Sequence, residues 1–161
     1  MKPNLPDLLT LNGDLAHDRA PQLLALINSL PGQPWTEAEL LIPLPDKFRY
    51  SRIWMTGDQV VGVVLASRKH KSVHIHQIVL EAAYRQLGLG RKVYRQIAAQ
   101  AEADGLTLLT AHCLLDDMGA LAFHTTLGLS LDSQYDDPQD GSVYGRLSVP
   151  LKVLLETGTQ P

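Results

Sequence analysis

The fold of this chain is decided by residues 74–91, His-Ile-His-Gln-Ile-Val-Leu-Glu-Ala-Ala-Tyr-Arg-Gln-Leu-Gly-Leu-Gly-Arg. Two histidines on a strand predicted over 73–80 are followed by an Arg-x-x-Gly-x-Gly turn and a helix predicted over 89–103. Gly88 and Gly90 lack a Cβ, so the turn amides can approach a phosphate closely. The N-terminus of the helix adds donors and a partial positive charge. The stretch predicts an enzyme with a phosphate-bearing cofactor near a proton acceptor.

Two other phosphate-binding motifs do not fit this turn. A P-loop ends in Gly-Lys-Ser/Thr, whereas Gly90 is followed by Arg91, Lys92 and Val93. A Rossmann fingerprint needs a third glycine three residues after Gly90, where this chain has Val93. An ordinary strand-to-helix turn without a function is the alternative that the residues leave open.

Composition limits the class of protein. The 161 residues predict one domain over 1–161, and the net charge of −3 argues against a general nucleic-acid binder. The single cysteine, Cys113, excludes an internal disulfide. No apolar run approaches the ~18 residues of a membrane span, and the first residues lack a signal-peptide core. We therefore expect a cytoplasmic protein that binds neither nucleic acid nor membrane.

Charge is unevenly distributed along the chain. Residues 82–101 contain four basic residues and no acid, whereas 116–140 contain six acids and no lysine or arginine. The first segment suits a phosphate, and Arg91 and Arg95, one helical turn apart, can reach outer phosphates of a cofactor. The second segment suits a cationic group. Two solvated faces of opposite charge are the alternative.

Hydrophobic periodicity predicts an α/β order. We expect strands at 7–11, 51–56, 59–67, 73–80, 106–113, 129–135 and 143–149. Helices are expected from an Asp18 cap to Leu30, after a Thr36–Glu39 capping box, at 89–103, and from an Asp117 cap to Leu127 with Gly128 as its C′ residue. Residues 43–50 are predicted to be a loop, 68–72 a basic turn, and the tail after Glu156 frayed.

These motifs carry a family resemblance over roughly residues 50–149. Arg85, Gly88 and Gly90 match the Arg/Gln-x-x-Gly-x-Gly/Ala turn of the GNAT superfamily of acetyl-CoA-dependent N-acetyltransferases. A second family element, Asn-x-x-Ala with a later Tyr and Gly-Phe, keeps its spacing here. Its positions hold Asp117, Ala120, His124, Gly128 and Leu129.

The resemblance implies a single α/β domain with a mixed, mostly antiparallel six- to seven-stranded sheet and helices on both faces. It further implies acetyl-CoA as cosubstrate, bound between two splayed central strands, and no metal. Dimers are common in the family, so a homodimer is possible. The implied cofactor contacts are Ile78, Val79, Leu80, Arg85, Gln86, Leu87, Gly88, Leu89, Gly90, Arg91 and Asp117.

The two histidines are the candidate proton acceptors. His74 and His76 share a strand face, and imidazole, with a pKa near ~6.5, can take a proton from an attacking ammonium at neutral pH. Their sequence is similar to the arylalkylamine (serotonin-type) acetyltransferases, which implies that this pair accepts the proton through water. A solvated strand face, or a metal pair completed by His112 or an acid, are the alternatives.

Other residues have two interpretations each. His124 replaces the family tyrosine that donates a proton to the CoA thiolate, but it can also be a surface residue that leaves this step to water. Asp117 is interpreted first as an N-cap. An aromatic wall for the acceptor, formed by Trp35, Phe48 and Tyr50, competes with core packing of these residues. Cys113 is interpreted as a small core residue whose neighbour His112 points to the opposite face.

The sequence predicts acetyl transfer from acetyl-CoA to a primary amine of a small molecule. Two alternatives are a protein or peptide N-acetyltransferase and a CoA-binding sensor without turnover.

Overall fold

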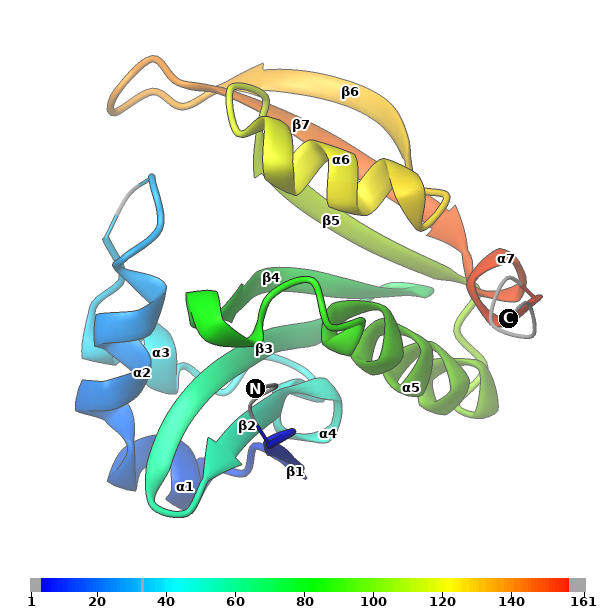
Figure 1. The fold of residues 1–161 in the computed structure, drawn as a ribbon. Helices are drawn as coiled ribbons and strands as arrows, with labels where there is room; N and C mark the ends of the chain where they lie inside the picture. The colour runs from blue at the N-terminus through cyan, green and yellow to red at the C-terminus, as the bar shows by residue number, and fades with distance from the viewer. Residues whose placement is uncertain (1–3, 33, 157–161) are drawn as a thin grey trace. The chain divides into compact units, whose positions relative to one another are not determined.

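Seven β-strands form one mixed sheet in the order β1-β2-β3-β4-β5-β7-β6 (Figure 1). The computed structural model describes residues 4–32 and 34–156. The strands are β1 (Asp7–Thr10), β2 (Arg52–Thr56), β3 (Gln59–Lys69), β4 (Ser72–Leu80), β5 (Leu108–Leu114), β6 (Ser130–Asp136) and β7 (Val143–Pro150). β4 and β5 are parallel, whereas β1–β2, β2–β3, β5–β7 and β6–β7 are antiparallel. The predicted α/β class with a mostly antiparallel mixed sheet is confirmed.

The helices are α1 (Gly13–Asp18), α2 (Ala20–Ile27), α3 (Glu37–Leu41), α4 (Lys47–Tyr50), the 3₁₀ turn η1 (Ala82–Tyr84), α5 (Leu89–Ala103), α6 (Met118–Thr126) and α7 (Leu151–Glu156). The described residues fall into two compact units. The first contains residues up to 68 together with 76–93, and the second contains 69–75 together with those from 94 onward. β4 and α5 contribute residues to both units.

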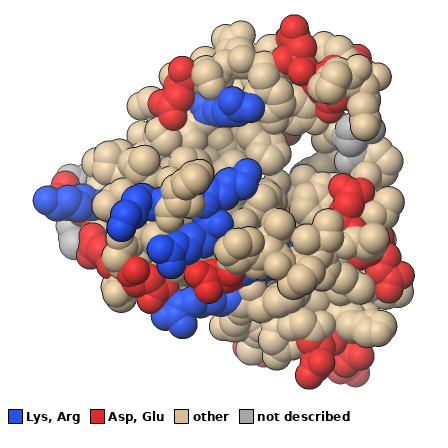
Figure 2. Space-filling view, turned by 180° about the vertical axis from the view of Figure 1, so that it is seen from behind, with Lys and Arg blue, Asp and Glu red and all other residues tan. Residues whose placement is uncertain are grey.

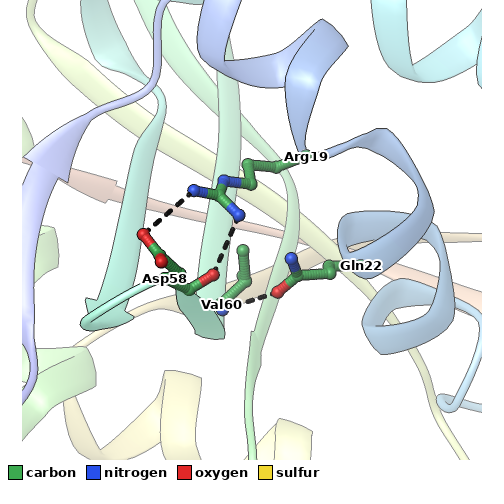
Figure 3. A network of polar contacts seen from close by, with 4 residues as sticks. All are labelled: Arg19, Gln22, Asp58 and Val60. Atoms are coloured by element: carbon green, nitrogen blue, oxygen red, sulfur yellow. Dashed lines mark hydrogen bonds and ion pairs between the residues drawn. The ribbon is translucent and has the colours of Figure 1, made fainter.

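The first unit has an aliphatic core made by residues of β2, β3, β4, α1, α2 and α3, together with Leu11 after β1. Three polar contacts from Arg19 and Gln22 attach its helices to the β2–β3 hairpin (Figure 3). The Arg19 guanidinium donates to the Asp58 carbonyl at 2.9 Å and lies 3.5 Å from the Asp58 carboxylate. The Val60 amide donates to Gln22 Oε1 at 2.9 Å. These contacts position α2 beside the hairpin that precedes β4.

Asp18 was expected to cap one helix, and this prediction is wrong. Asn12 caps α1 by accepting the Leu15 amide at 2.8 Å, and Asp18 is the last residue of that helix. Pro21 lies in the first turn of α2, where its missing N–H costs no hydrogen bond. Because proline cannot continue the helix before it, the chain forms two short helices.

The expected loop at 43–50 contains the short helix α4. The capping box at Thr36 and Glu39 is confirmed, and α3 ends before Pro43 as predicted. Lys47 then folds back, with 2% of its surface exposed, and donates to carbonyl groups at the end of α3, including that of Ile42 at 2.9 Å. Pro43 and Pro45 indicated a loop in the sequence. In the structure, the Lys47 ammonium donates hydrogen bonds to carbonyls at the C-terminal end of α3, which have no partner within that helix.

Further along the chain, the boundaries agree closely with expectation. α5 covers the residues predicted for it, and Gly105 follows with φ 85°. The basic turn is shorter than expected, because β3 extends to Lys69 and β4 starts at Ser72. Gly128 has φ 101° after α6, as its C′ role requires. The helix α7 was not predicted, and the tail after Glu156 lies outside the described residues.

Candidate functional site

His74 is held between two residues of the neighbouring strand β5. The parallel register places His74 opposite Thr110, and His74 Nδ1 lies 2.7 Å from Thr110 Oγ1. On its other side, His74 Nε2 lies 3.3 Å from Nδ1 of His112, and the two rings stack with centroids 5.4 Å apart. Both ring nitrogens of His74 are therefore engaged, which fixes the orientation of the ring.

His76 contacts β3 instead. Its Nε2 atom lies 2.6 Å from the hydroxyl of Ser67, a buried residue of β3. Along β4 the burial alternates, with Val73 and Ile75 buried and both histidines half-buried. This alternation is the pattern expected of two histidines on one strand face.

His112 faces away from the core, as expected from its neighbour Cys113, which is buried. Burial lowers the pKa of His112, and its electrostatic interactions with Lys69, His124 and Arg146 lower it further. The ring of Tyr144 meets it edge-on at 6.0 Å. His112 is therefore neutral at neutral pH and can share a proton with His74.

The turn after β4 has the backbone geometry of an anion cradle. Arg85 Nε donates to the Leu80 carbonyl at 2.8 Å, which fastens the start of the turn to the end of β4. Gln86 and Gly88 have φ values of 61° and 82°, both in the left-handed region. Helical bonding in α5 begins with the Lys92 amide donating to the Gly88 carbonyl, so the amides of residues 89–91 lie outside the intrahelical pattern. Such amides at a helix start favour an anion.

Arg95 adds a cationic donor on α5. Its Nε atom is buried without a hydrogen-bond partner in the structure. An unsatisfied buried guanidinium N–H is costly, and a phosphate oxygen would satisfy it. Figure 2, seen from behind relative to Figure 1, shows Lys and Arg side chains gathered on part of that face, with acidic side chains among and around them. The amides at the start of α5 and the buried Arg95 Nε fit a ligand that carries phosphate groups.

A glycine in β3 allows close packing at the end of β4. A Cβ at Gly62 would lie 2.6 Å from side-chain atoms of both Leu80 and Trp54, and 3.1 Å from the Val79 carbonyl. Val79 is buried, while Ile78 and Leu80 are half-buried. Any side chain at position 62 would therefore displace the strand segment predicted to contact the cofactor.

His124 lies inside the second unit rather than on a surface, with 3% exposure. Its Nδ1 atom lies 2.9 Å from the Ala120 carbonyl, which can only accept, so Nδ1 carries the proton. The Tyr94 hydroxyl then donates to His124 Nε2 at 2.8 Å. Burial lowers the pKa of His124, whereas the Ala120 bond and Asp117 oppose this effect. Burial also raises the pKa of Tyr94, so the pair is neutral.

Asp117 is confirmed as the N-cap of α6, since its Oδ1 accepts the Ala120 amide at 3.1 Å. Trp35, Phe48 and Tyr50 are the residues predicted either to form an aromatic wall for the acceptor or to pack in the core. Trp35 and Phe48 pack against the core of the first unit, and Tyr50 is fully buried. Core packing, the alternative stated for these residues, is confirmed for Tyr50.

The acidic loop after β6 is partly explained by local structure. Asp137 accepts a hydrogen bond from the Gln139 amide and Asp140 accepts one from the Ser142 amide, each at 2.8 Å.

Within residues 4–32 and 34–156, no three His, Cys, Asp or Glu side chains come together as a metal site. No helix in these ranges is long and apolar enough to cross a membrane.

Sequence reasoning did not assign Thr110, Ser67 or Tyr94 to the site. Each is a hydrogen-bond partner of a predicted histidine. The sequence predicts His112 as a possible metal ligand and as the neighbour of Cys113 on the opposite strand face. The alternating burial of β5 places Thr110 and His112 on one face, and the register and hydrogen bonds between β4 and β5 show that both meet His74.

Comparison with known proteins agrees with this arrangement. No curated protein matches the chain significantly. The ribosomal-protein-S18-alanine N-acetyltransferase from Escherichia coli has a similar structure, with a TM-score of 0.73, 14% identity, and coverage of 91% of this chain and 94% of that chain. The putative acetyltransferase yncA from Salmonella typhimurium, solved with acetyl-CoA, has a TM-score of 0.69 and 12% identity, with coverage of 92% of this chain and 95% of that chain.

Naa50 from Arabidopsis thaliana, in complex with the bisubstrate analogue CoA-Ac-MVNAL, gives a TM-score of 0.69 and 15% identity, with coverage of 89% of this chain and 97% of that chain. At these identities, the structural similarities show the fold alone. The model of the acetyltransferase (GNAT) family, in contrast, matches residues 20–129, which include β4, the turn and α6. The chain therefore belongs to the acetyltransferase (GNAT) family.

Proposed function

We propose that this protein transfers an acetyl group from acetyl-CoA to a primary amine, which attacks the thioester directly. The observation that carries the proposal is that two histidines on β4 are held in place by hydrogen-bond partners. His74 is oriented by Thr110 and His112, and His76 by Ser67. The strand that carries them runs directly into a turn with anion-binding geometry. Residues 1–161 then form one N-acetyltransferase domain, with its cofactor-binding core at about 50–149.

The cofactor is assigned to the end of β4 and the following turn. Backbone groups of Ile78, Val79 and Leu80 would pair with the pantetheine arm, and the amide of Val79 or Leu80 would stabilise the oxyanion. Residues 85–91 would hold the pyrophosphate, with Asp117 as a further contact. When bound, acetyl-CoA supplies the activated acetyl thioester.

Proton movement is assigned to the histidines. A substrate ammonium with a pKa of ~10 must lose a proton before it attacks, and imidazole is a suitable acceptor at neutral pH. His74 and His76 take this role. His124 or water then returns a proton to the CoA thiolate. The burial of His124 and the donation of its only N–H to Ala120 favour water.

The acceptor class is open to direct test. The His-x-His resemblance supports an arylalkylamine as the first acceptor. A peptide N-terminus is the second candidate, because structurally similar proteins include Naa50 with its peptide-bearing bisubstrate analogue. A CoA-binding sensor would bind acetyl-CoA without transferring the acetyl group.

The experiment is a screen of acetyl-CoA consumption, followed by the release of free thiol, across arylalkylamines, polyamines, aminoglycosides and peptides. We expect turnover with arylalkylamines and its loss in the His74→Ala, His76→Ala double variant. His17→Asn, which removes an exposed imidazole from α1, is the matched control. Wild-type rates in the double variant would refute the assigned proton acceptors. Turnover of peptides alone would replace the acceptor class, and calorimetric binding of acetyl-CoA without any turnover would favour the sensor.

A further inference from the structure

Three side chains of the second unit form a continuous chain of short contacts. Thr110 Oγ1 lies 2.7 Å from His74 Nδ1, and His74 Nε2 lies 3.3 Å from His112 Nδ1. The two imidazole rings are inclined by only 22° to one another. We propose that His112, His74 and Thr110 form a proton relay in which the proton enters at His112 and is held on His74. This inference rests on the proposed acetyl transfer.

The arrangement of protons follows from the atoms that face one another. Two ring nitrogens in contact can share only one proton, so one imidazole donates and the other accepts. If His112 Nδ1–H donates to His74, then His74 Nδ1–H donates to the Thr110 hydroxyl. If His74 Nε2–H donates, its Nδ1 accepts from Thr110. Both arrangements satisfy these two contacts. Converting the first into the second moves one proton along each bond, takes up a proton at His112 Nε2 and releases the original hydroxyl proton of Thr110.

The end of the relay at which a proton enters is His112 Nε2. Both nitrogens of His74 are occupied by Thr110 and His112. In the described part of the chain, no residue makes a hydrogen bond to Nε2 of His112. A proton from an ammonium therefore binds at Nε2, the Nδ1 proton of His112 moves to His74 Nε2, and charge is conserved because the amine becomes neutral as one imidazolium forms.

The surroundings decide which imidazole keeps the proton. The groups acting on His112 are Lys69 at the end of β3, Arg146 on β7 and His124 on α6, and Tyr144 meets its ring edge-on. Burial, followed by the electrostatic effects of Lys69, His124 and Arg146, lowers the pKa of His112. This effect disfavours a proton on His112 and favours its transfer along the hydrogen bond to His74. Two adjacent imidazolium rings would repel one another, so the pair holds one added proton.

The experiment separates orientation of His74 from proton transfer. Asparagine places a polar atom near the position of histidine Nδ1 but has no second ring nitrogen, so His112→Asn can orient His74 without relaying a proton. We expect kcat to fall by about tenfold or more, as for loss of a general acid–base group, with the KM for acetyl-CoA within about twofold of wild type. The control His17→Asn keeps wild-type kcat.

Two further readouts distinguish a relay from a structural role. Added imidazole should restore part of the kcat of His112→Ala, because it can occupy the vacated space. The double variant His74→Asn, His112→Asn should be no slower than the slower single variant, since both belong to one path. Wild-type kcat in His112→Asn, additive losses in the double variant, or a folded His112→Ala that imidazole does not rescue would each overturn the relay.

A measurement without turnover keeps the relay separate from the proposed reaction. Nitrogen-15 NMR of the histidine rings reports the tautomer of each imidazole. We expect the signals of His74 and His112 to change over the same pH range in the wild type, and the His74 signals to change in His112→Asn. Independent titration of the two rings would refute the shared proton. A protein that shows coupled rings but acetylates no amine would refute the proposed function and leave the proton pair established.

Discussion

Gly88 provides the sharpest test of the anion cradle, because its requirement for glycine is purely conformational. Its φ of 82° lies in the left-handed region, and a Cβ built there would meet no atom within 4 Å. Gly88→Ala therefore introduces backbone strain without a steric clash. An L-residue in this region costs about 1–2 kcal/mol. For a chain of this length that loss lowers Tm by roughly 2–8 °C.

Gly105 is the matched control. It has φ 85°, a Cβ there would also meet nothing within 4 Å, and it lies in the turn after α5 rather than before it. Gly105→Ala should cost about the same stability. In Gly88→Ala, however, relaxing the strain rotates the amides at the start of α5 away from their common direction. We expect its KM for acetyl-CoA to rise about tenfold, with the KM of Gly105→Ala unchanged.

The assay combines thermal unfolding with acetyl-CoA saturation curves for both variants. Equal Tm losses with a KM effect only in Gly88→Ala would support the cradle. Equal KM values in the two variants would refute the reasoning, because the turn would then contribute no oriented amides to the cofactor.

Other expected outcomes follow from buried polar groups. Lys47→Met leaves carbonyls at the end of α3 without their donor and should lower the free energy of urea unfolding by about 1–3 kcal/mol; an unchanged midpoint would contradict the capping role. His124→Gln should lower the free energy of unfolding by a similar amount, because the Tyr94 hydroxyl loses its acceptor. In the same variant, a kcat loss below about tenfold would identify water as the proton donor to the thiolate, whereas a loss above about 100-fold would identify His124. Because burial lowers the pKa of His124 below its ordinary 6.5, the unfolded chain binds its proton first. Stability from this group is present above pH 6.5 and is lost as the pH falls toward the lower folded pKa, so unfolding measured from pH 7.5 to 5 should show a decline that is smaller in His124→Gln. Arg95→Gln should raise the calorimetric Kd for acetyl-CoA while leaving Tm within about 2 °C, since its buried Nε makes no hydrogen bond to any residue that the structure describes. An unchanged Kd would exclude a phosphate contact.

Much of the fold was predictable because its signals are local. The helix Leu89–Ala103 has the bounds expected from its glycines and periodicity, and the capping box at Thr36 and Glu39 forms as predicted. Predictions were wrong where a distant partner or a single proline outweighs periodicity. Pro21 separates α1 from α2. The expected loop contains the short helix α4, and Lys47 in this helix binds carbonyls at the end of an earlier helix.

The sequence by itself determined the strand–turn–helix order, the Arg-x-x-Gly-x-Gly turn and the family, since glycine positions, caps and spacing act over a few residues. The tertiary structure alone decided what surrounds each histidine. His74 meets Thr110 and His112 because β4 and β5 pair in one parallel register, and Thr110 lies 36 residues away in sequence. His124 is buried, and its Nε2 atom finds a hydrogen-bond partner in Tyr94, which lies 30 residues away in sequence. Register and burial depend on packing between distant segments, which no local pattern encodes.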